Sequence, residues 1–125
     1  MKATLSNSEL ALMEELWRRE KVTAPELRDC LYPNSTKSQH GTIQKLLQRL
    51  EAKGFVKRDK SHSLHFFSPL ISKEAYGAEQ LESLADKLTS GSIAPLITHM
   101  IEERKISRSE IARLRRILAL NKDEE

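Results

Sequence analysis

The apolar residues of this 125-residue chain change their spacing at Gly54. Before Gly54, three stretches place apolar side chains every three or four residues, as amphipathic helices do. After it, two short apolar runs, 55–58 and 64–68, flank the polar turn 59–63, as the strands of a hairpin do. Three helices followed by a basic-tipped hairpin are typical of the winged helix, a variant of the helix-turn-helix. We therefore predict a mainly α fold (α+β class) that begins with a winged helix-turn-helix.

Capping signals place the starts of the first two helices. Ser6 and Glu9 have the spacing of a capping box. Thr23 is suited to cap a second, short helix, with Pro25 in its first turn. The turn-forming residues of 32–35 should end that helix.

The third predicted helix is the most regular of the three. Either Thr36 or Ser38 is suited to cap its start, and Gly54 occupies the place where a left-handed residue ends a helix. The stripe that we expect to be buried consists of Ile43, Leu46, Leu47 and Leu50. The opposite face of this helix is therefore available to solvent or to a ligand.

Basic residues are concentrated in this helix and the hairpin. The whole chain has 21 Lys and Arg against 18 Asp and Glu, a net charge of +3. Residues 37–60 alone carry seven basic side chains against two acidic ones, which gives this segment a net charge of +5. A local basic surface of this kind is typical of nucleic-acid binding proteins.

The exposed face of the third helix carries side chains that can read DNA. A helix fits the major groove, where each base pair presents a distinct pattern of donors and acceptors. Gln44 is suited to pair with adenine, Lys45 with guanine or a phosphate, and Gln48 is a second base reader. Thr42 would donate to a phosphate or touch a thymine methyl group, and Arg49 would hold a phosphate or a neighbouring acid.

The hairpin is expected to hold the DNA backbone through Lys57, Arg58 and Lys60. An alternative function for a winged helix is that of a protein-interaction or adaptor module without sequence-specific DNA binding. That alternative predicts an apolar or acidic exposed face on the third helix. The face is polar and basic here, which favours DNA.

The tail is predicted to contain three short amphipathic helices. Thr89-Ser90-Gly91 separates the first from the second, which Ser92 is suited to cap, and Ser107 begins a capping box for the third. Helices this short are marginal alone, so they must bury their apolar faces against the same subunit or a second copy. We expect a homodimer, with residues 1–72 as the DNA-binding domain and 73–125 as the dimerisation domain. The predicted dimer interface comprises Leu81, Leu84, Leu88, Leu96, Ile97, Met100, Ile101, Ile111, Leu114 and Leu118.

Other classes of function find little support in the sequence. The four histidines have no carboxylate or nucleophile at a catalytic spacing, and no Cys or Asp cluster completes a metal site around His62 and His65. We therefore expect no enzymatic activity, no metal and no cofactor. The single cysteine, Cys30, is expected to be a small buried residue and fits a reducing compartment. No apolar run is long enough to insert into a membrane and no signal peptide is evident, so we expect a cytoplasmic protein.

The chain resembles the penicillinase-repressor (BlaI/MecI) family of bacterial transcriptional regulators. The resemblance covers nearly the whole length and rests on the order and spacing of several segments. These are 8–17, which runs into Trp17, then 22–27, 42–50, 53–58 with the later Phe66 and Ser68, and 110–118.

The resemblance implies a homodimer that represses its target operons, with a membrane-bound sensor protease that responds to β-lactams. It also implies induction by cleavage of the tail, at a bond equivalent to His99–Met100. Relatives that are cleaved have Asn-Phe at that bond. Gly41 replaces a basic residue, and Gln44 and Lys45 replace Arg and Thr, which predicts a different operator. The chain ends without the cysteine-rich motif of the copper-responsive branch, which disfavours copper sensing.

Overall fold

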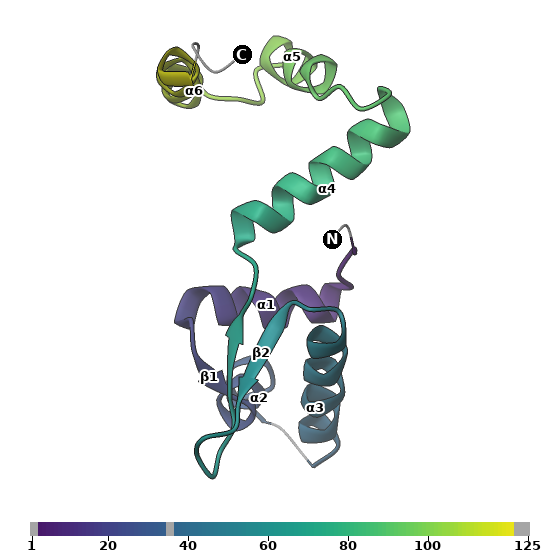
Figure 1. Cartoon of the computed structure of the whole chain (residues 1–125), viewed down its shortest axis with the longest axis vertical. Helices are drawn as coiled ribbons and strands as arrows, with labels where there is room; N and C mark the ends of the chain where they lie inside the picture. Colours follow the sequence, from purple (N-terminus) through teal and green to yellow (C-terminus); the bar gives the residue numbers. More distant parts are fainter. Residues whose placement is uncertain (1–2, 35–36, 122–125) are drawn as a thin grey trace. The chain divides into compact units, whose positions relative to one another are not determined.

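The computed structural model describes residues 3–34 and 37–121, which form two compact units, 1–80 and 81–125 (Figure 1). The first unit contains three helices and a three-stranded sheet, and α4 (Lys73–Leu88) crosses from the first unit into the second. The division between the units falls within α4, after Gln80. The architecture is the mainly α winged helix with a helical tail that the sequence predicts.

The predicted capping box of α1 (Asn7–Arg19) forms, and Thr23, the predicted cap of α2 (Ala24–Leu31), forms a capping box as well. The Glu9 amide donates to Ser6 Oγ at 3.2 Å, and the Ser6 amide donates to Glu9 Oε1 at 2.8 Å. Thr23 and Glu26 make the same reciprocal pair, at 3.3 and 2.9 Å. Each box satisfies amides that the first turn of a helix leaves without partners.

Helix α3 (Lys37–Ala52) buries the predicted stripe of Ile43, Leu46, Leu47 and Leu50 completely or nearly so. The helix begins at Lys37, so Ser38, one of the two predicted caps, lies inside it, and the other, Thr36, lies outside the described residues. The predicted end of α3 at Gly54 is confirmed. Gly54 adopts a φ of 82°, and the Phe55 amide donates to the Leu50 carbonyl at 2.9 Å, as in a Schellman motif.

The sheet has three antiparallel strands in the order β1-β3-β2. Strands β2 (Val56–Asp59) and β3 (Phe66–Pro69) are the predicted hairpin, displaced by one or two residues from the predicted limits. Strand β1 (Val22–Thr23) was not predicted, because two residues are too few to show an alternating pattern. It pairs with Phe66 and Phe67 and so covers the edge of β3 opposite β2.

Aromatic side chains fasten the start of α4 to the core of the first unit. Trp17 is partly buried, and its Nε1 donates to the Ile71 carbonyl at 2.9 Å. The Tyr76 ring packs edge-on to Phe55 at 5.8 Å between centroids, and its hydroxyl accepts a hydrogen bond from the Leu5 amide at 3.0 Å. The first turns of α4 therefore belong to the winged helix.

A partly buried ion pair joins α1 to Lys53, the residue that follows α3. Lys53 Nζ lies 2.9 and 3.0 Å from the two carboxylate oxygens of Glu9, whose side chain is only 3% exposed. Burial raises the pKa of Glu9, but hydrogen bonds from Ser6 and the charge and hydrogen bond of Lys53 outweigh it and hold the pKa below 4.5.

This pair should make the winged helix sensitive to acid. Because the pKa of Glu9 is lowered on folding, its contribution is present above pH 4.5 and is lost as the pH falls through the folded value. We expect Glu9→Gln to cost about 1–3 kcal/mol at pH 7 and much less at pH 3. Urea unfolding at both pH values measures the difference. Glu14→Gln, at an exposed position of the same helix, is the control, and an equal loss at both pH values would contradict this assignment.

The tail continues with α5 (Ala94–Glu102) and α6 (Arg108–Asn121). The break at 89–91 is confirmed, with positive φ at Ser90 and Gly91. The prediction that Ser92 caps α5 is wrong. Ile93 precedes the helix without a side-chain cap, because Ser92 belongs to a turn in which its amide and carbonyl both bond to Thr89.

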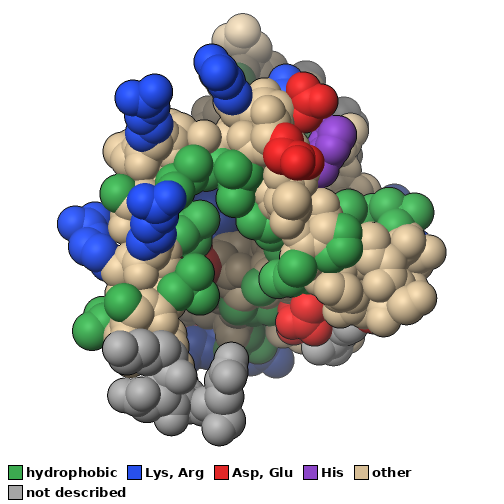
Figure 2. Space-filling model, turned by 90° about the horizontal axis from the view of Figure 1, so that it is seen from above, with side chains coloured by type: hydrophobic (Ala, Val, Ile, Leu, Met, Phe, Trp, Pro, Cys, Tyr) green, Lys and Arg blue, Asp and Glu red, His purple; other side chains and the backbone are tan. Residues whose placement is uncertain are grey.

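The predicted capping box of α6 is present, since the Glu110 amide donates to Ser107 Oγ at 3.2 Å and the Ser107 amide donates to Glu110 Oε1 at 3.0 Å. In Figure 2, hydrophobic side chains gather on the sides of α5 and α6 that face each other, and basic side chains point outward from α6. No helix in the described part of the chain is long and apolar enough to cross a membrane.

Candidate nucleic-acid interface

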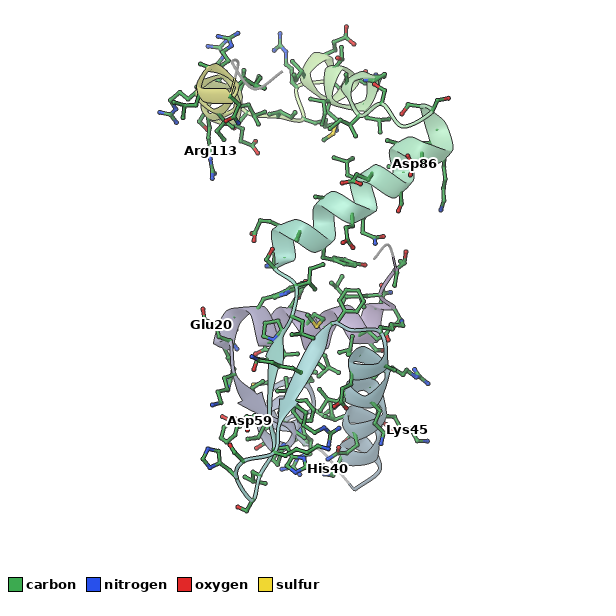
Figure 3. All side chains as sticks on the ribbon, viewed as in Figure 1. Glu20, His40, Lys45, Asp59, Asp86 and Arg113 are labelled. Atoms are coloured by element: carbon green, nitrogen blue, oxygen red, sulfur yellow. The ribbon has the colours of Figure 1, made fainter. Side chains whose placement is uncertain are left out.

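The solvent face of α3 presents the side chains that the sequence singled out as DNA readers. Thr42, Lys45, Gln48 and Arg49 are exposed, and Gln44 is half-buried. Figure 3 shows Lys45 projecting from α3 away from the sheet. Among the described side chains, none forms an ion pair with Lys45 or Arg49, so both charges are available to an external anion.

Two of the three basic side chains predicted to contact DNA from the hairpin are also exposed and available to an external anion. Lys57 and Lys60 are exposed and have no ion-pair partner within residues 3–34 and 39–121. An exposed lysine on a wing can move to meet a phosphate at little cost in packing.

Arg58 is placed differently, because it fastens the hairpin to α3. Its Nη2 and Nε lie 3.0 and 3.3 Å from the two carboxylate oxygens of Glu51, and its guanidinium stacks on the Phe67 ring at 4.7 Å. Such a two-point pair fixes the guanidinium in place. The structure therefore gives Arg58 a positioning contact that sequence reasoning missed, since no local pattern links Glu51 to Arg58.

The turn of the hairpin is ordered by Asp59. Its carboxylate accepts hydrogen bonds from Ser61 Oγ at 2.6 Å and from the Ser61 amide at 2.9 Å. The bond from Ser61 Oγ has the larger effect, and together the two bonds hold the pKa of Asp59 below its ordinary value of 3.8. Lys21 lies 3.9 Å from Asp59 and over the Phe66 ring at 5.1 Å, so this lysine, which the sequence did not single out, adds a basic group beside the wing.

The remaining candidate groups are engaged in other contacts. Within the described part of the chain, no three His, Cys, Asp or Glu side chains come together as a metal site would require. His62 packs edge-on against Phe66 at 5.8 Å. Cys30 is only half-buried, contrary to the prediction of a buried residue, and its Sγ lies 2.8 Å from Arg19 Nη2.

A small winged helix with an unpaired basic face on its third helix is typical of double-stranded DNA-binding proteins. Comparison with known families agrees with this class. The penicillinase repressor family matches residues 5–120, and the chain belongs to that family.

Characterised relatives match over most of their length. The chain is 27% identical to the penicillinase repressor of Bacillus licheniformis over 119 residues, which cover 95% of this chain and 92% of that protein. It is 25% identical to the methicillin resistance regulatory protein MecI of Staphylococcus aureus (strain N315), over 91% of this chain and 92% of that protein. It is 28% identical to the transcriptional regulator BlaI of Mycobacterium tuberculosis, over 92% of this chain and 83% of that protein. These relatives are named as a repressor, a regulatory protein and a transcriptional regulator, which implies a regulator rather than an enzyme.

Proposed function

We propose that the chain is a sequence-specific transcriptional repressor that binds double-stranded operator DNA as a homodimer. The observation that carries this proposal is the basic and polar face of α3, where Lys45 and Arg49 have no ion-pair partner among the described side chains, beside a wing whose Lys57 and Lys60 also have none. The relative named as a penicillinase repressor supports the same function. An adaptor module would need an apolar or acidic surface on α3, and the described face is neither.

The α3 face divides into base-reading and backbone-binding groups. Gln44, Lys45 and Gln48 lie within about one turn of helix and would face base edges in the major groove. Thr42 and Arg49 flank them and would hold phosphates, as Lys57 and Lys60 of the wing would. Arg58 would act mainly by keeping the wing at a fixed distance from α3.

The tail carries a large unpartnered apolar surface that a second copy would cover. Six of the ten predicted interface residues are exposed, and Leu88 and Leu118 are 67% and 68% exposed. The other exposed ones are Leu84, Met100, Ile101 and Leu114, while Leu81, Leu96, Ile97 and Ile111 are half-buried. A group of large exposed apolar side chains on a soluble protein typically marks a surface that binds another protein. A symmetric dimer formed through the tail would bind a pseudo-palindromic operator.

The proposed regulation is proteolysis of the tail at the bond His99–Met100. The bond His99–Met100 lies inside α5, where the His99 carbonyl accepts a hydrogen bond from the Glu103 amide at 2.9 Å. A membrane-bound sensor protease would therefore have to unwind this turn before cleavage. The genes that we propose for repression are those of antibiotic resistance or stress, and the protein would act in the bacterial cytoplasm.

Two groups of variants test the assignment of α3 and the wing. Gln44→Ala with Lys45→Ala should weaken binding to the promoter of the protein's own gene by roughly 1–3 kcal/mol per base contact, with little effect on unrelated DNA. Lys60→Ala should weaken binding to all sequences alike and lower the salt dependence, the slope of log K against log salt, by about 0.9. Lys87→Ala, which removes an exposed lysine from the end of α4, is the control. Unchanged promoter affinity in the double variant would refute the role of α3.

A further inference from the structure

A glycine lies on the exposed face of α3, where the backbone does not require one. Gly41 belongs to the second turn of the helix and is exposed to solvent. Its φ does not lie in the left-handed region, so any residue other than proline could adopt its conformation. Glycine also stabilises a helix interior less than those residues do. The conformation of α3 therefore gives no reason for a glycine at this position.

The packing of the winged helix gives no reason for it either. A methyl group added at Gly41 would meet no described heavy atom within 4 Å, apart from its neighbours in the chain and the backbone of α3 itself. The space beside Gly41 is therefore open in the described part of the chain. A glycine in such a place allows another molecule to approach the backbone closely.

The direction in which Gly41 faces indicates which molecule that is. At about 100° per residue, Gly41 lies between Gln44 and Lys45 around the axis of α3. Gln48 follows two turns later, within about 20° of the same direction. This direction is opposite to the buried stripe of α3. Gly41 is therefore at the centre of the face that would read bases, whereas Gly77, which is also exposed and without neighbours, lies on α4.

The only contact that Gly41 can offer there is apolar. Inside a helix the amide and carbonyl groups are engaged in helical hydrogen bonds, so its Cα methylene is the group that remains. The apolar group that base edges present in the major groove is the C5 methyl of thymine. A side chain on the helix and this methyl group would compete for the same space. A glycine is thus suited to a thymine at this point of the groove.

We propose that Gly41 is a specificity-determining residue: α3 lies against the base edges here, and the open space beside Gly41 admits the methyl group of a thymine in the operator. The inference rests on the proposed function and deepens it, because it names a base that the recognition face selects. The close approach would also bring Gln44 and Lys45, on either side of Gly41, within hydrogen-bonding reach of neighbouring bases.

The experiment compares variants of the full chain in binding to a fluorescein-labelled duplex from the promoter of the protein's own gene. Gly41→Ala should weaken this binding about tenfold and Gly41→Leu about a hundredfold, because each side chain overfills the contact. Binding to an unrelated duplex, which depends on phosphate contacts, should change little. The midpoint of thermal unfolding should instead rise by about 2–8 °C in Gly41→Ala, since alanine favours a helix.

Gly77→Ala is the matched control, because it makes the same change at an exposed position inside another helix. It should raise the unfolding midpoint similarly and leave the affinity for the promoter unchanged. A gain in stability joined to a loss of affinity in Gly41→Ala is a result that a purely structural role would not produce.

Replacing thymine by uracil, which removes only the C5 methyl group, tests the identity of the base. Each thymine of the promoter segment that the protein protects is replaced in turn. At one position, uracil should weaken binding of the unaltered protein by about fourfold, through loss of one buried methyl group. At the same position it should strengthen binding of Gly41→Ala, because the alanine methyl group then occupies the space that the thymine methyl group has left.

Three results would overturn the inference. They are a Gly41→Ala variant that binds the promoter as tightly as the unaltered protein, an equal loss of affinity in Gly77→Ala, and a set of uracil replacements of which none strengthens binding of Gly41→Ala. An unaltered protein that binds the promoter no better than unrelated DNA would overturn the proposed function itself, and this inference with it.

Discussion

Leu114→Glu together with Leu118→Glu is expected to convert the proposed dimer to a monomer. Both side chains lie on one stripe of α6 and are 43% and 68% exposed in the single chain, so a glutamate there would be buried without a partner in the dimer. Light scattering at micromolar concentration measures the change in mass. Because a dimer binds two half-sites at once, we expect affinity for the full operator to fall by about a hundredfold or more.

Ala112→Glu is the matched control, because it adds the same charge to α6 at an exposed position away from the stripe. It should leave the protein dimeric. Affinity for a duplex with one half-site should be nearly the same in the unaltered protein and in the double variant, since the winged helix is unchanged. A double variant that remains a dimer would place the interface elsewhere, and an unaltered protein that is monomeric at these concentrations would contradict the dimer itself.

The features that the sequence could predict are those set by residues within four positions of one another. The capping boxes at Ser6, Thr23 and Ser107 depend on contacts between a residue and its third successor, and all three form. The buried stripe of α3 follows from helical spacing in the same way. Ser92 shows the limit of such patterns, since a neighbouring turn with Thr89 engages it before it can cap α5.

The features that could not be predicted depend on contacts between distant segments. Strand β1 exists because Val22 and Thr23 meet a strand more than 40 residues later in the chain. The pair between Glu51 and Arg58 forms because the turn after α3 folds β2 back along the helix. It gives Arg58 a positioning contact that its charge alone could not predict, while the phosphate contact of Arg58 stays a prediction.

Phe67→Ala is expected to have the largest effect on the stability of the winged helix. Phe67 lies in the central strand, is 2% exposed and carries the Arg58 guanidinium over its ring at 4.7 Å. Removing a buried phenyl ring typically costs about 3–5 kcal/mol, a large share of the ~5–15 kcal/mol that stabilises a small domain. Urea unfolding followed by circular dichroism measures the loss in the free energy of unfolding. The sequence shows two adjacent phenylalanines and does not say which one is buried.

Phe66→Ala tests that assignment directly, because successive side chains of a strand point to opposite faces. Phe66 is half-buried, and its ring contacts Lys21 and His62 near the surface. We expect its removal to cost about 1 kcal/mol. A larger loss in Phe66→Ala than in Phe67→Ala would mean that β3 pairs one residue out of the observed register, since such a slip exchanges the two faces of the strand. The same slip in register would separate the Arg58 guanidinium from the Phe67 ring. Arg58→Ala would then lower the free energy of unfolding equally in the unaltered protein and in the Phe67→Ala variant.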